Sequence, residues 1–324
     1  MDSVSVHIVT FNSADDIEAC LEAVNNQTHP IDQIVVVDNA SNDDTVTIIK
    51  KWRDKNIHLP LQIVENKRNN GFAGGHNQAI NQTKTDFSLI LNPDVSLDPN
   101  YIRHILEVMN SSPSTGSATG KLYRDEKGMI LDSTGIAIKK NRRAYDRGAN
   151  EKDEGQWDEH TDLFGVSGAA AVYRRKMIED ISVNGQFFDE TFFAYKEDVD
   201  VAWRAKLLGW KATFVPRAIA LHQRGWKEEK KRSEIPLFIR HHSYINRYYM
   251  MVKNEKVSFL ILHSPIIIFY EIASFFYAIM KERELLTVWK QMSTFSSMFE
   301  KRKQIQSRSI ESANNIYRFF KGIW

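Results

Sequence analysis

The 324-residue chain is 42% hydrophobic and 26% charged, which is ordinary for a globular protein and excludes an intrinsically disordered one. Its one cysteine, Cys20, excludes an internal disulfide and a thiolate metal cluster. The net charge of +2 hides an asymmetry, because residues 1–216 hold 24 Lys and Arg against 32 Asp and Glu (−8), whereas residues 217–324 hold 19 against 9 (+10).

The first hundred residues alternate strand-like and helix-like segments. Runs rich in Val, Ile, Leu or Phe predict strands at Val4–Val9, Ile34–Val37, Leu61–Val64 and Phe87–Leu91. Helical spacing lies between them at Asp15–Asn26, Asp43–Lys55 and Gly75–Gln82. This alternation predicts a parallel sheet with right-handed crossovers, and the ligands of such sheets bind beyond the carboxyl ends of the strands. The amino terminus reads as a strand and not as a secretory signal, which predicts a cytosolic location.

The rest of the chain is less regular. Residues 113–165 are rich in glycine and charge, which predicts a mobile loop or an excursion over a cleft. The apolar pattern resumes at Phe164–Val172, and Glu197–Leu208 predicts a helix that stops at Gly209. Two closing strands are predicted at Lys211–Val215 and Ala218–Leu221.

Polar residues follow each of the four early strands. They are Thr10 to Asn12, Asp38 to Ser41, the run NNGFAGGHN at 69–77, and Asn92 to Asp94. A carboxylate at a strand end can accept from the imide N–H of uracil or thymine, and glycines at a helix start let the backbone approach phosphate. Taken singly, each feature also fits a helix cap or a tight turn. The run at 69–77 is not the GxGxxG dinucleotide fingerprint.

Together these residues resemble glycosyltransferase family 2. The motifs that carry the resemblance are VDNASNDDT at 37–45, NNGFAGGHNQAI at 69–80, LNPDV at 91–95 and FFAYKEDVDVAWRAKLLGW at 192–210. The likeness covers roughly residues 4–225. It implies an α/β fold of GT-A type, with a mostly parallel central sheet flanked by helices, and transfer of a sugar from a nucleotide diphosphate donor with inversion.

The LNPDV motif and the apolar tail are most similar to those of bacterial rhamnosyltransferases of cell-surface polysaccharide synthesis. This narrower likeness implies dTDP-rhamnose as the donor. The same motifs tolerate a UDP-hexose or UDP-galactofuranose donor, which changes the sugar but not the mechanism.

The resemblance assigns roles to the matched positions. Asp38 would contact the donor base, with Thr10 and Asn12 lining that pocket. The substrate-binding residues implied are Thr10, Asn12, Asp38, Asn39, Asn70, Gly71, Gly74, Asn77, Asn92, Glu197, Trp203, Arg204 and Arg224. Of these, Trp203 and Arg204 are implied as structural or substrate-side supports.

A divalent metal is also implied. Asp94 matches the last position of an Asp-x-Asp motif that holds Mg²⁺ or Mn²⁺ against the diphosphate, and His222 lies where related enzymes place a histidine on the metal or the diphosphate. The first acidic position of the motif is Asn92 in this chain, so a single carboxylate is left for the ion. That arrangement is chemically reasonable, because Mg²⁺ commonly keeps waters and takes one or two carboxylates.

Glycosyl transfer needs a base for the acceptor hydroxyl. The cluster Glu197-Asp198-x-Asp200 opens a helix, where three acids can also serve only the helix dipole. The resemblance implies that Asp198 is the catalytic base, whereas Asp200, on another helix face, is expected to cap the helix or form an ion pair. Asp132 is a candidate for the acceptor subsite, and Arg224 with Lys227–Arg232 could close over the phosphates.

Residues 226–324 are predicted to form a helical, membrane-associated region behind a catalytic domain at 1–225. Ser264-Pro265 is a helix start, so a helix of roughly 24 Å is expected from Pro265 to about Met280, short of the roughly 30 Å needed to span a bilayer. A narrow polar stripe on this helix suits partial immersion. The stripe contains His263, Ser264, Glu271, Ser274, Lys281 and Glu282.

A second amphipathic stretch follows, with Lys301 to Lys303 behind it. Its apolar positions are Leu285, Val288, Trp289, Met292, Phe295 and Phe299. The alternative is a helix pair packed on the catalytic domain or on a twin subunit, which would make a homodimer. The apolar content between the basic clusters excludes a nucleic-acid arm.

The sequence thus predicts a peripheral enzyme on the cytoplasmic face of the cell membrane that acts on a lipid-linked glycan. The alternative from another class is a non-catalytic nucleotide-sugar-binding scaffold of a polysaccharide assembly complex. A nucleotidyltransferase is disfavoured, because the amino-terminal region lacks a basic glycine-rich triphosphate loop. The enzyme hypothesis requires Asp94 and Asp198 to face one cavity from opposite sides.

Overall fold

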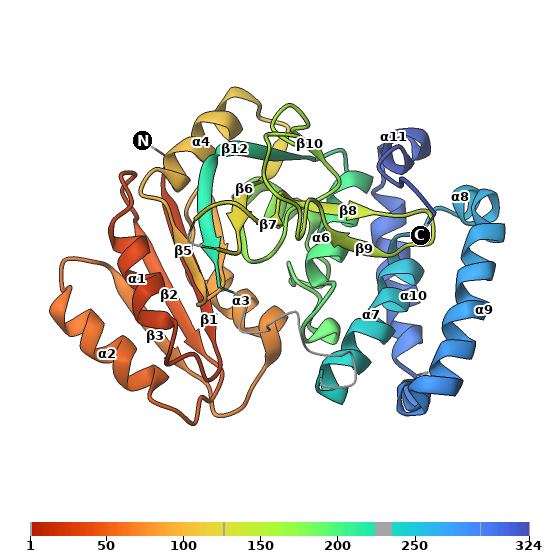
Figure 1. Cartoon of the computed structure of the whole chain (residues 1–324), viewed down its shortest axis with the longest axis horizontal. Helices are drawn as coiled ribbons and strands as arrows, with labels where there is room; N and C mark the ends of the chain where they lie inside the picture. Colours follow the sequence, from red (N-terminus) through yellow and green to blue (C-terminus); the bar gives the residue numbers. More distant parts are fainter. Residues whose placement is uncertain (1, 126, 224–234, 292, 324) are drawn as a thin grey trace.

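A central sheet runs through the computed structural model, which describes residues 2–125, 127–223, 235–291 and 293–323 (Figure 1). The strands, in chain order, are β1 (Val4–Thr10), β2 (Gln33–Asp38), β3 (Leu61–Glu65), β4 (Phe87–Leu91), β5 (Val95–Leu97), β6 (Thr115–Tyr123), β7 (Leu131–Ser133), β8 (Ile136–Ile138), β9 (Ala144–Asp146), β10 (Asp162–Leu163), β11 (Ala170–Arg174) and β12 (Lys211–His222). The main sheet has the order β10-β12-β6-β11-β4-β1-β2-β3, with β5 paired to β12 and β7 to β6. Strands β8 and β9 form a separate hairpin.

Most neighbouring strands of the amino-terminal half are parallel. β1 pairs in parallel with β2 and β4, and β2 pairs in parallel with β3. β6 and β12 are also parallel, whereas β11 runs antiparallel between β4 and β6. The parallel arrangement predicted for the four early strands is confirmed, and these strands lie where the sequence predicts them. The sheet as a whole is mixed, because β5, β7, β10 and β11 each pair antiparallel with a neighbour.

Helices cover both faces of this sheet. They are α1 (Ile17–Asn25), α2 (Thr45–Lys55), α3 (Gly71–Gln82), α4 (Tyr101–Ser111), α5 (Arg175–Ile181), the 3₁₀ turn η1 (Glu190–Phe192) and α6 (Glu197–Leu207). Alternate side chains of β2 point to opposite faces: Ile34 and Val36 pack with α1 and α2, whereas Val35 and Val37 pack against Ala79 of α3. The predicted helix from Gly75 in fact begins at Gly71, so its glycines lie inside the first turns.

The prediction of a mobile loop over 113–165 is wrong for much of that segment. Strand β6 is a buried interior strand of the sheet, between β12 and β11. Its sequence TGSATGKLY lacks a Val or Ile run because the neighbouring chain comes very close: a Cβ on Gly120 would lie 2.0 Å from the carbonyl oxygen of Ala218. Small residues therefore fill this strand for steric reasons. The β8–β9 hairpin, in contrast, does reach a cavity, as described below.

Strand β12 is one strand and not the two predicted. Its pairing with β6 shifts register between Val215 and Ile219, around Pro216 and Arg217. Proline has no N–H to donate to the ladder, which accounts for an irregularity at this point. The strand continues beyond it to His222, and this continuation carries the histidine to the site.

The C-terminal helices share a core with the sheet domain. They are α7 (Leu237–Asn254), α8 (Val257–Leu262), α9 (Ser264–Lys281), the 3₁₀ segment η3 (Arg283–Gln291), α10 (Ser293–Ser307) and α11 (Ala313–Tyr317). One buried cluster joins Tyr249, Met298 and Tyr317 of these helices to Phe164 and Trp203 of the sheet domain. The predicted domain boundary at 225/226 lies outside the described residues, as do Arg224 and Lys227–Arg232.

The second amphipathic stretch packs on protein. Leu285 and Val288 are buried, and the ring of Trp289 lies 4.8 Å from that of Tyr248. Lys301 forms a 2.6 Å ion pair with Asp189. Leu285, Val288 and Trp289 therefore pack on protein, as the alternative predicts, whereas Phe299 is 54% exposed. Met292 lies outside the described residues.

A buried ion cluster ties α6 to α7. Lys253 contacts Asp189 at 2.6 Å and Asp200 at 2.8 Å, and Asp200 also pairs with Arg204. Burial alone would raise the pKa of both carboxyls, but Lys253 with its cationic neighbours outweighs burial and holds both pKa values low. Because folding lowers these pKa values, the cluster stabilises the fold above the unfolded-state pKa of about 4, and this contribution is lost as pH falls.

We expect Lys253→Met to destabilise the fold by about 3–5 kcal/mol, because two buried carboxylates lose their shared cation. Urea unfolding at neutral pH measures this change. The matched control is Lys152→Met, at an exposed lysine that pairs with Glu154 at 3.8 Å. That control should change stability by less than about 0.5 kcal/mol. Equal losses in both variants would contradict a role for the buried cluster.

Candidate active site

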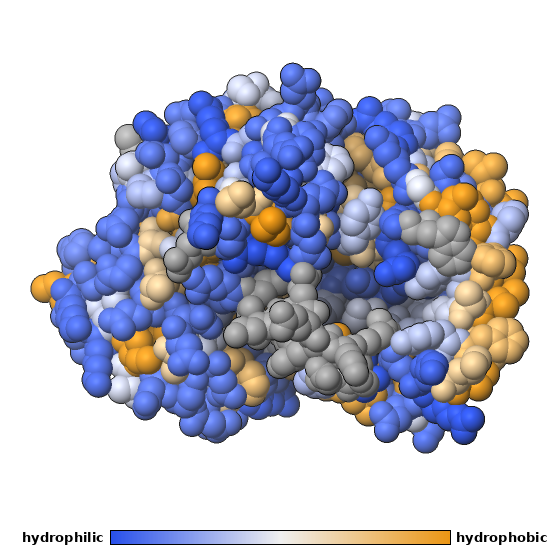
Figure 2. Space-filling view, in the orientation of Figure 1, coloured by the Kyte–Doolittle hydropathy of each residue, from blue (hydrophilic) through white to orange (hydrophobic). Residues whose placement is uncertain are grey.

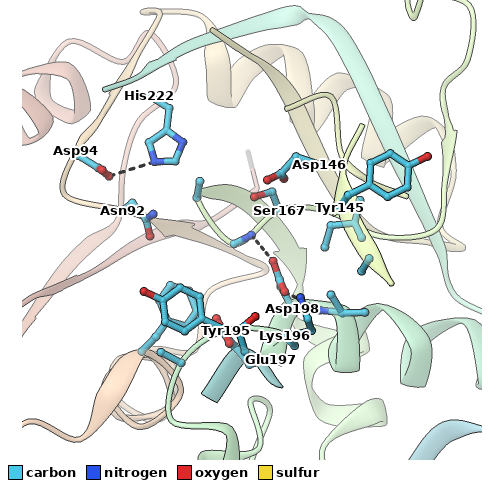
Figure 3. Close-up of a pocket in the computed structure, with 18 residues that line it drawn as sticks. Asn92, Asp94, Tyr145, Asp146, Ser167, Tyr195, Lys196, Glu197, Asp198 and His222 are labelled. Carbon is cyan, nitrogen blue, oxygen red and sulfur yellow. Dashed lines mark hydrogen bonds and ion pairs between the residues drawn. The ribbon is translucent and has the colours of Figure 1, made fainter. Parts of the chain in front are cut away.

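A cavity of about 440 Å³ opens beyond the carboxyl ends of β4 and β12 and at the start of α6. Asp94 and His222 lie on one wall, and Glu197 and Asp198 lie on the facing wall, with Asp146 and Ser167 between them (Figure 3). The two acids that the sequence analysis required to converge therefore face one space. The site lies at the strand ends, where a parallel sheet predicts it.

Sheet pairing brings Asp94 and His222 together. β5 pairs antiparallel with β12, in a register that sets Val95 opposite His222. Asp94 Oδ1 lies 3.3 Å from His222 Nε2, and His222 Nδ1 lies 2.8 Å from Asp132 Oδ2. Burial lowers the pKa of His222, but the neighbouring carboxylates of Asp132 and Asp94 outweigh burial and raise it to about 9.

Asp132 lies behind the histidine. Its side chain is fully buried and also accepts a hydrogen bond from Arg124 at 3.1 Å. The suggestion that Asp132 reaches the acceptor is therefore wrong, because the carboxylate points at the far nitrogen of the imidazole. It fixes the ring orientation instead.

Asp198 occupies the opposite wall. Its Oδ2 accepts a hydrogen bond from the Gly168 N–H at 3.3 Å, and its Oδ1 accepts one from the Val199 N–H at 2.7 Å. Burial raises the pKa of Asp198, and the nearby carboxylate of Asp146 raises it further. Burial, followed by the charge of Asp198, also raises the pKa of Glu197. A carboxylate with a raised pKa is a stronger proton acceptor.

The loop before α6 is held in an unusual conformation. Phe193, Tyr195 and Lys196 have φ values of +60°, +71° and +72°, which are sparsely populated for residues other than glycine. Asn246 of α7 holds this loop, because its Nδ2 donates to the carbonyl oxygens of Phe192, Ala194 and Tyr195 at 2.8–2.9 Å. Strain of this kind persists only where surrounding contacts impose it.

Gly71 meets the same loop from the other side. A Cβ on Gly71 would lie 2.4 Å from the carbonyl oxygen of Phe193, and Gly71 has φ +74°. Only glycine satisfies both conditions. At Gly74, a Cβ would lie 3.0 Å from the Cβ of Asn70.

The residues expected at the donor base lie at the ends of β1 and β2. Asp38 is buried and accepts hydrogen bonds from Thr10 Oγ1 at 2.9 Å and from the Ser41 N–H at 2.9 Å. Asn12 Oδ1 accepts from the Asn42 N–H at 2.8 Å, and Asn39 Nδ2 donates to the Gly71 carbonyl at 2.9 Å. In the described part of the chain, these residues do not line the 440 Å³ cavity. Their contact with a base stays a prediction.

Three of the residues expected near the substrate are buried away from the cavity, and for Trp203 and Arg204 this is the structural alternative of the sequence analysis. The Asn77 side chain bonds both backbone groups of Phe188, donating at 2.7 Å and accepting at 3.0 Å. Trp203 is buried in the core. Arg204 is 1% exposed and donates to the carbonyls of Ile181 and Phe187. Each of these side chains is buried among protein groups, which assigns it a structural role. Asp200 pairs with Arg204 as expected.

The remaining predicted residues divide in two groups. Asn92 and Glu197 line the cavity with Asp94, Asp198 and His222. Arg224 lies outside the described residues, and Asn70 flanks α3, where its Oδ1 accepts from Arg68 at 3.3 Å. The sequence analysis missed Tyr145 and Asp146, which the β8–β9 hairpin brings into the cavity, and Lys196.

Comparison with known proteins gives the family. The sequence model described as glycosyl transferase family 2 matches residues 5–182, more than half of the chain. The chain belongs to glycosyltransferase family 2. A poly-beta-1,6-N-acetyl-D-glucosamine synthase of Staphylococcus aureus (strain MSSA476) is 22% identical over 223 residues, which cover 68% of this chain and 49% of that protein. The chain thus spans about half the length of the curated relatives it matches.

Solved structures share the fold. The mannosyltransferase PcManGT of Pyrobaculum calidifontis, in complex with GDP-Man and Mn²⁺, has a TM-score of 0.54 at 16% identity and covers 94% of this chain and 85% of its own. Staphylococcus aureus TarS in complex with UDP has a TM-score of 0.54 at 15% identity, covering 94% and 90%. GalNAc-T7 with UDP, GalNAc and Mn²⁺ has a TM-score of 0.62 at 13% identity, covering 98% and 58%. The GT-A type of α/β fold expected for this family 2 member is confirmed.

The wall of Asp94 and His222 fits a divalent ion in this family 2 protein. Asp94 Oδ1 is buried, and no donor in the described residues makes a well-formed hydrogen bond to it. A carboxylate oxygen and an imidazole nitrogen 3.3 Å apart are suitable donors for one first-row ion, which would displace the proton that the imidazole carries at neutral pH. No cluster of three or more protein donors occurs among the described residues, so the diphosphate and water would complete the coordination.

We expect Asp94→Asn to weaken Mn²⁺ binding in the presence of UDP by about tenfold or more, because the ion loses its anionic protein ligand. Asp132→Asn should weaken it about 10–100-fold by releasing the orientation of His222. Electron paramagnetic resonance of free Mn²⁺ measures both affinities. Asp54→Asn, at an exposed acid on α2, serves as the control. Unchanged Mn²⁺ binding by Asp94→Asn would contradict a metal site on this wall.

Proposed function

We propose that this protein is an inverting glycosyltransferase that moves a sugar from a nucleotide diphosphate donor to a glycan acceptor. The observation that carries the proposal is the single cavity with a metal-binding wall at Asp94 and His222 and a carboxylate of raised pKa at Asp198 facing it. Inversion requires the nucleophile and the leaving group on opposite sides of the anomeric carbon. The two walls provide those two positions.

The residues of the two walls have different roles in the proposed reaction. Asp198 accepts the proton of the acceptor hydroxyl while the acceptor oxygen bonds to the anomeric carbon, and the bond from that carbon to the diphosphate oxygen breaks. Asp94 and His222 would hold Mg²⁺ or Mn²⁺, which when bound neutralises charge on the leaving diphosphate. Positioning a base of this kind contributes roughly 10²–10⁴-fold.

For the donor we propose dTDP-rhamnose, with UDP-hexose and UDP-galactofuranose as alternatives. Support for rhamnose comes from the LNPDV sequence and the apolar tail. Support for a UDP-sugar comes from the fold likeness to TarS in complex with UDP and with UDP-GlcNAc. The relatives named as poly-N-acetylglucosamine synthases support a role in polysaccharide synthesis.

The variant Asp198→Asn tests the reaction. We expect it to reduce sugar transfer by roughly 10²–10⁴-fold while nucleotide-sugar binding stays unchanged, because the amide cannot take the proton but has the same shape. Transfer and slow donor hydrolysis are measured with dTDP-rhamnose, UDP-galactofuranose and UDP-GlcNAc, and Asp54→Asn serves as the control. Loss of transfer with intact binding supports the enzyme. An unaffected glycan output in cells carrying Asp198→Asn would favour the non-catalytic scaffold. Turnover of a UDP-sugar without turnover of dTDP-rhamnose would contradict the rhamnose donor and favour a UDP-sugar donor.

We further propose that α9 rests on the cytoplasmic face of the cell membrane. Of the described helices, α9 alone is long and apolar enough to cross a membrane by length and composition, and 11% of it is buried. Its apolar side chains form the hydrophobic edge at the right of Figure 2. The exposed members are Ile268, Phe269, Ile272, Phe275, Phe276 and Met280.

The polar stripe of α9 faces the protein. Glu271 pairs with Arg247 at 2.6 Å and accepts from Tyr248 Oη at 2.6 Å, both on α7. Glu282, just after the helix, pairs with Arg240 at 3.1 Å. A helix with an ion-paired inner side and an apolar outer side suits the membrane interface better than a span.

We expect the double variant Phe269→Asp/Phe276→Asp to lose binding to vesicles that contain anionic lipid, by about tenfold or more, because two exposed phenyl rings that would enter the lipid become charged groups. Vesicle flotation measures the bound fraction. The matched control is Ile57→Asp, since Ile57 is 85% exposed on the far side of the sheet domain. Vesicle binding that survives the double variant, together with a change from dimer to monomer in light scattering, would assign this face to a homodimer.

A further inference from the structure

A second cavity, of about 450 Å³, lies between α7 and α9 and adjoins the active-site cavity. The two cavities share Ala144, Lys196 and Ser243 as lining residues. A ligand that occupies the second cavity can therefore extend into the space in front of Asp198. The second cavity is called the α7–α9 cavity below.

Tyrosines line much of this cavity. Tyr244 and Tyr248 come from α7, and Tyr270 and Tyr277 come from α9. The two α9 tyrosines are seven residues apart, so they lie on one helix face. The exposed apolar side chains of α9 occupy the other face, so one helix separates the cavity from the proposed membrane surface.

Cations complete the lining. Arg247 is 6% exposed and already pairs with Glu271, and its guanidinium lies 4.7 Å from the centre of the Tyr270 ring. Arg143 and Lys196 also line the cavity, and neither forms an ion pair within 4.0 Å among the described residues. On the active-site side, the negative charges of Asp198 and Glu197 interact with the ammonium group of Lys196. The cavity itself thus offers positive charge and aromatic rings but no unpaired acid.

We propose that the α7–α9 cavity is the acceptor subsite and that it binds the phosphate-linked part of a lipid-carried glycan. This proposal rests on the proposed function and names the acceptor class. Arg143 and Lys196 bind the phosphate oxygens through charge-assisted hydrogen bonds, and the tyrosine rings pack against the first sugar. The lipid chain continues past Tyr277 to the apolar face of α9, and the glycan extends toward Asp198.

The experiment uses the full chain in EDTA, so that a metal-dependent donor site does not contribute. Binding of three probes is measured by titration calorimetry: farnesyl diphosphate, inorganic pyrophosphate and farnesol. We expect farnesyl diphosphate to bind about tenfold or more tightly than either fragment, because only this probe has both the lipid and the diphosphate. Arg143→Glu and Tyr277→Ala should each weaken its binding, the first by about tenfold or more.

The control is Arg53→Glu, at an exposed arginine on α2, which should bind all three probes as the wild type does. Arg143 and Tyr277 are partly exposed, so their variants should fold, and thermal unfolding verifies this. Equal affinity of wild type and Arg143→Glu would overturn the subsite. Pyrophosphate binding as tight as farnesyl diphosphate binding would overturn the lipid-carried acceptor in favour of a free phosphate. Both outcomes are independent of the Asp198→Asn result, which tests the transfer reaction.

Discussion

The pairing of the three-residue strand β5 with the end of β12 is the constraint on which the site depends. It sets Asp94 beside His222, although the two residues are far apart in the sequence, and β12 is itself fixed to β6 along most of its length. Asp132 then comes from β7, which also pairs with β6, and orients the imidazole. The proposed metal wall is therefore built on the sheet, where side chains are held more firmly than on loops.

The opposite wall depends on the C-terminal helices. Asp198 begins α6 directly after a loop of strained residues, and Asn246 of α7 holds the carbonyl groups of that loop. Lys253, one turn beyond Tyr249 on the same helix, binds Asp200 in the first turn of α6. Helix α7 thus positions the base as well as forming one side of the α7–α9 cavity. The C-terminal region therefore helps to build the proposed active site, in addition to carrying the proposed membrane surface.

Much of this arrangement could be predicted from the sequence. The local apolar pattern and the strand order locate the ends of β1 to β4, and Asp94 follows the end of β4. The position of Asp198 follows from the helix start at Glu197. Strand β6 could not be predicted from its sequence, because the close approach of β12 favours small residues such as Gly, Ala and Ser over Val and Ile. The sequence left both a structural and a substrate-side role open for Trp203 and Arg204, because helical spacing defines a common face but not whether that face meets a ligand or the core. Asp146 and Lys196 reach the cavity only through tertiary contacts.

Helix α9 reverses the usual arrangement of a surface helix, which buries its apolar side and exposes its polar one. Its Glu271 and Ser274 face α7, where Arg247 forms an ion pair with the half-buried Glu271 carboxylate, and phenyl rings point outward. In water this arrangement exposes apolar area without compensation, so an apolar surrounding is the condition under which it is favourable. With α9 on the proposed membrane surface, its polar inner side would line a cavity for charged and hydroxylated groups directly beneath the lipid. One helix with two unlike faces can therefore hold an acceptor whose own two ends differ in the same way.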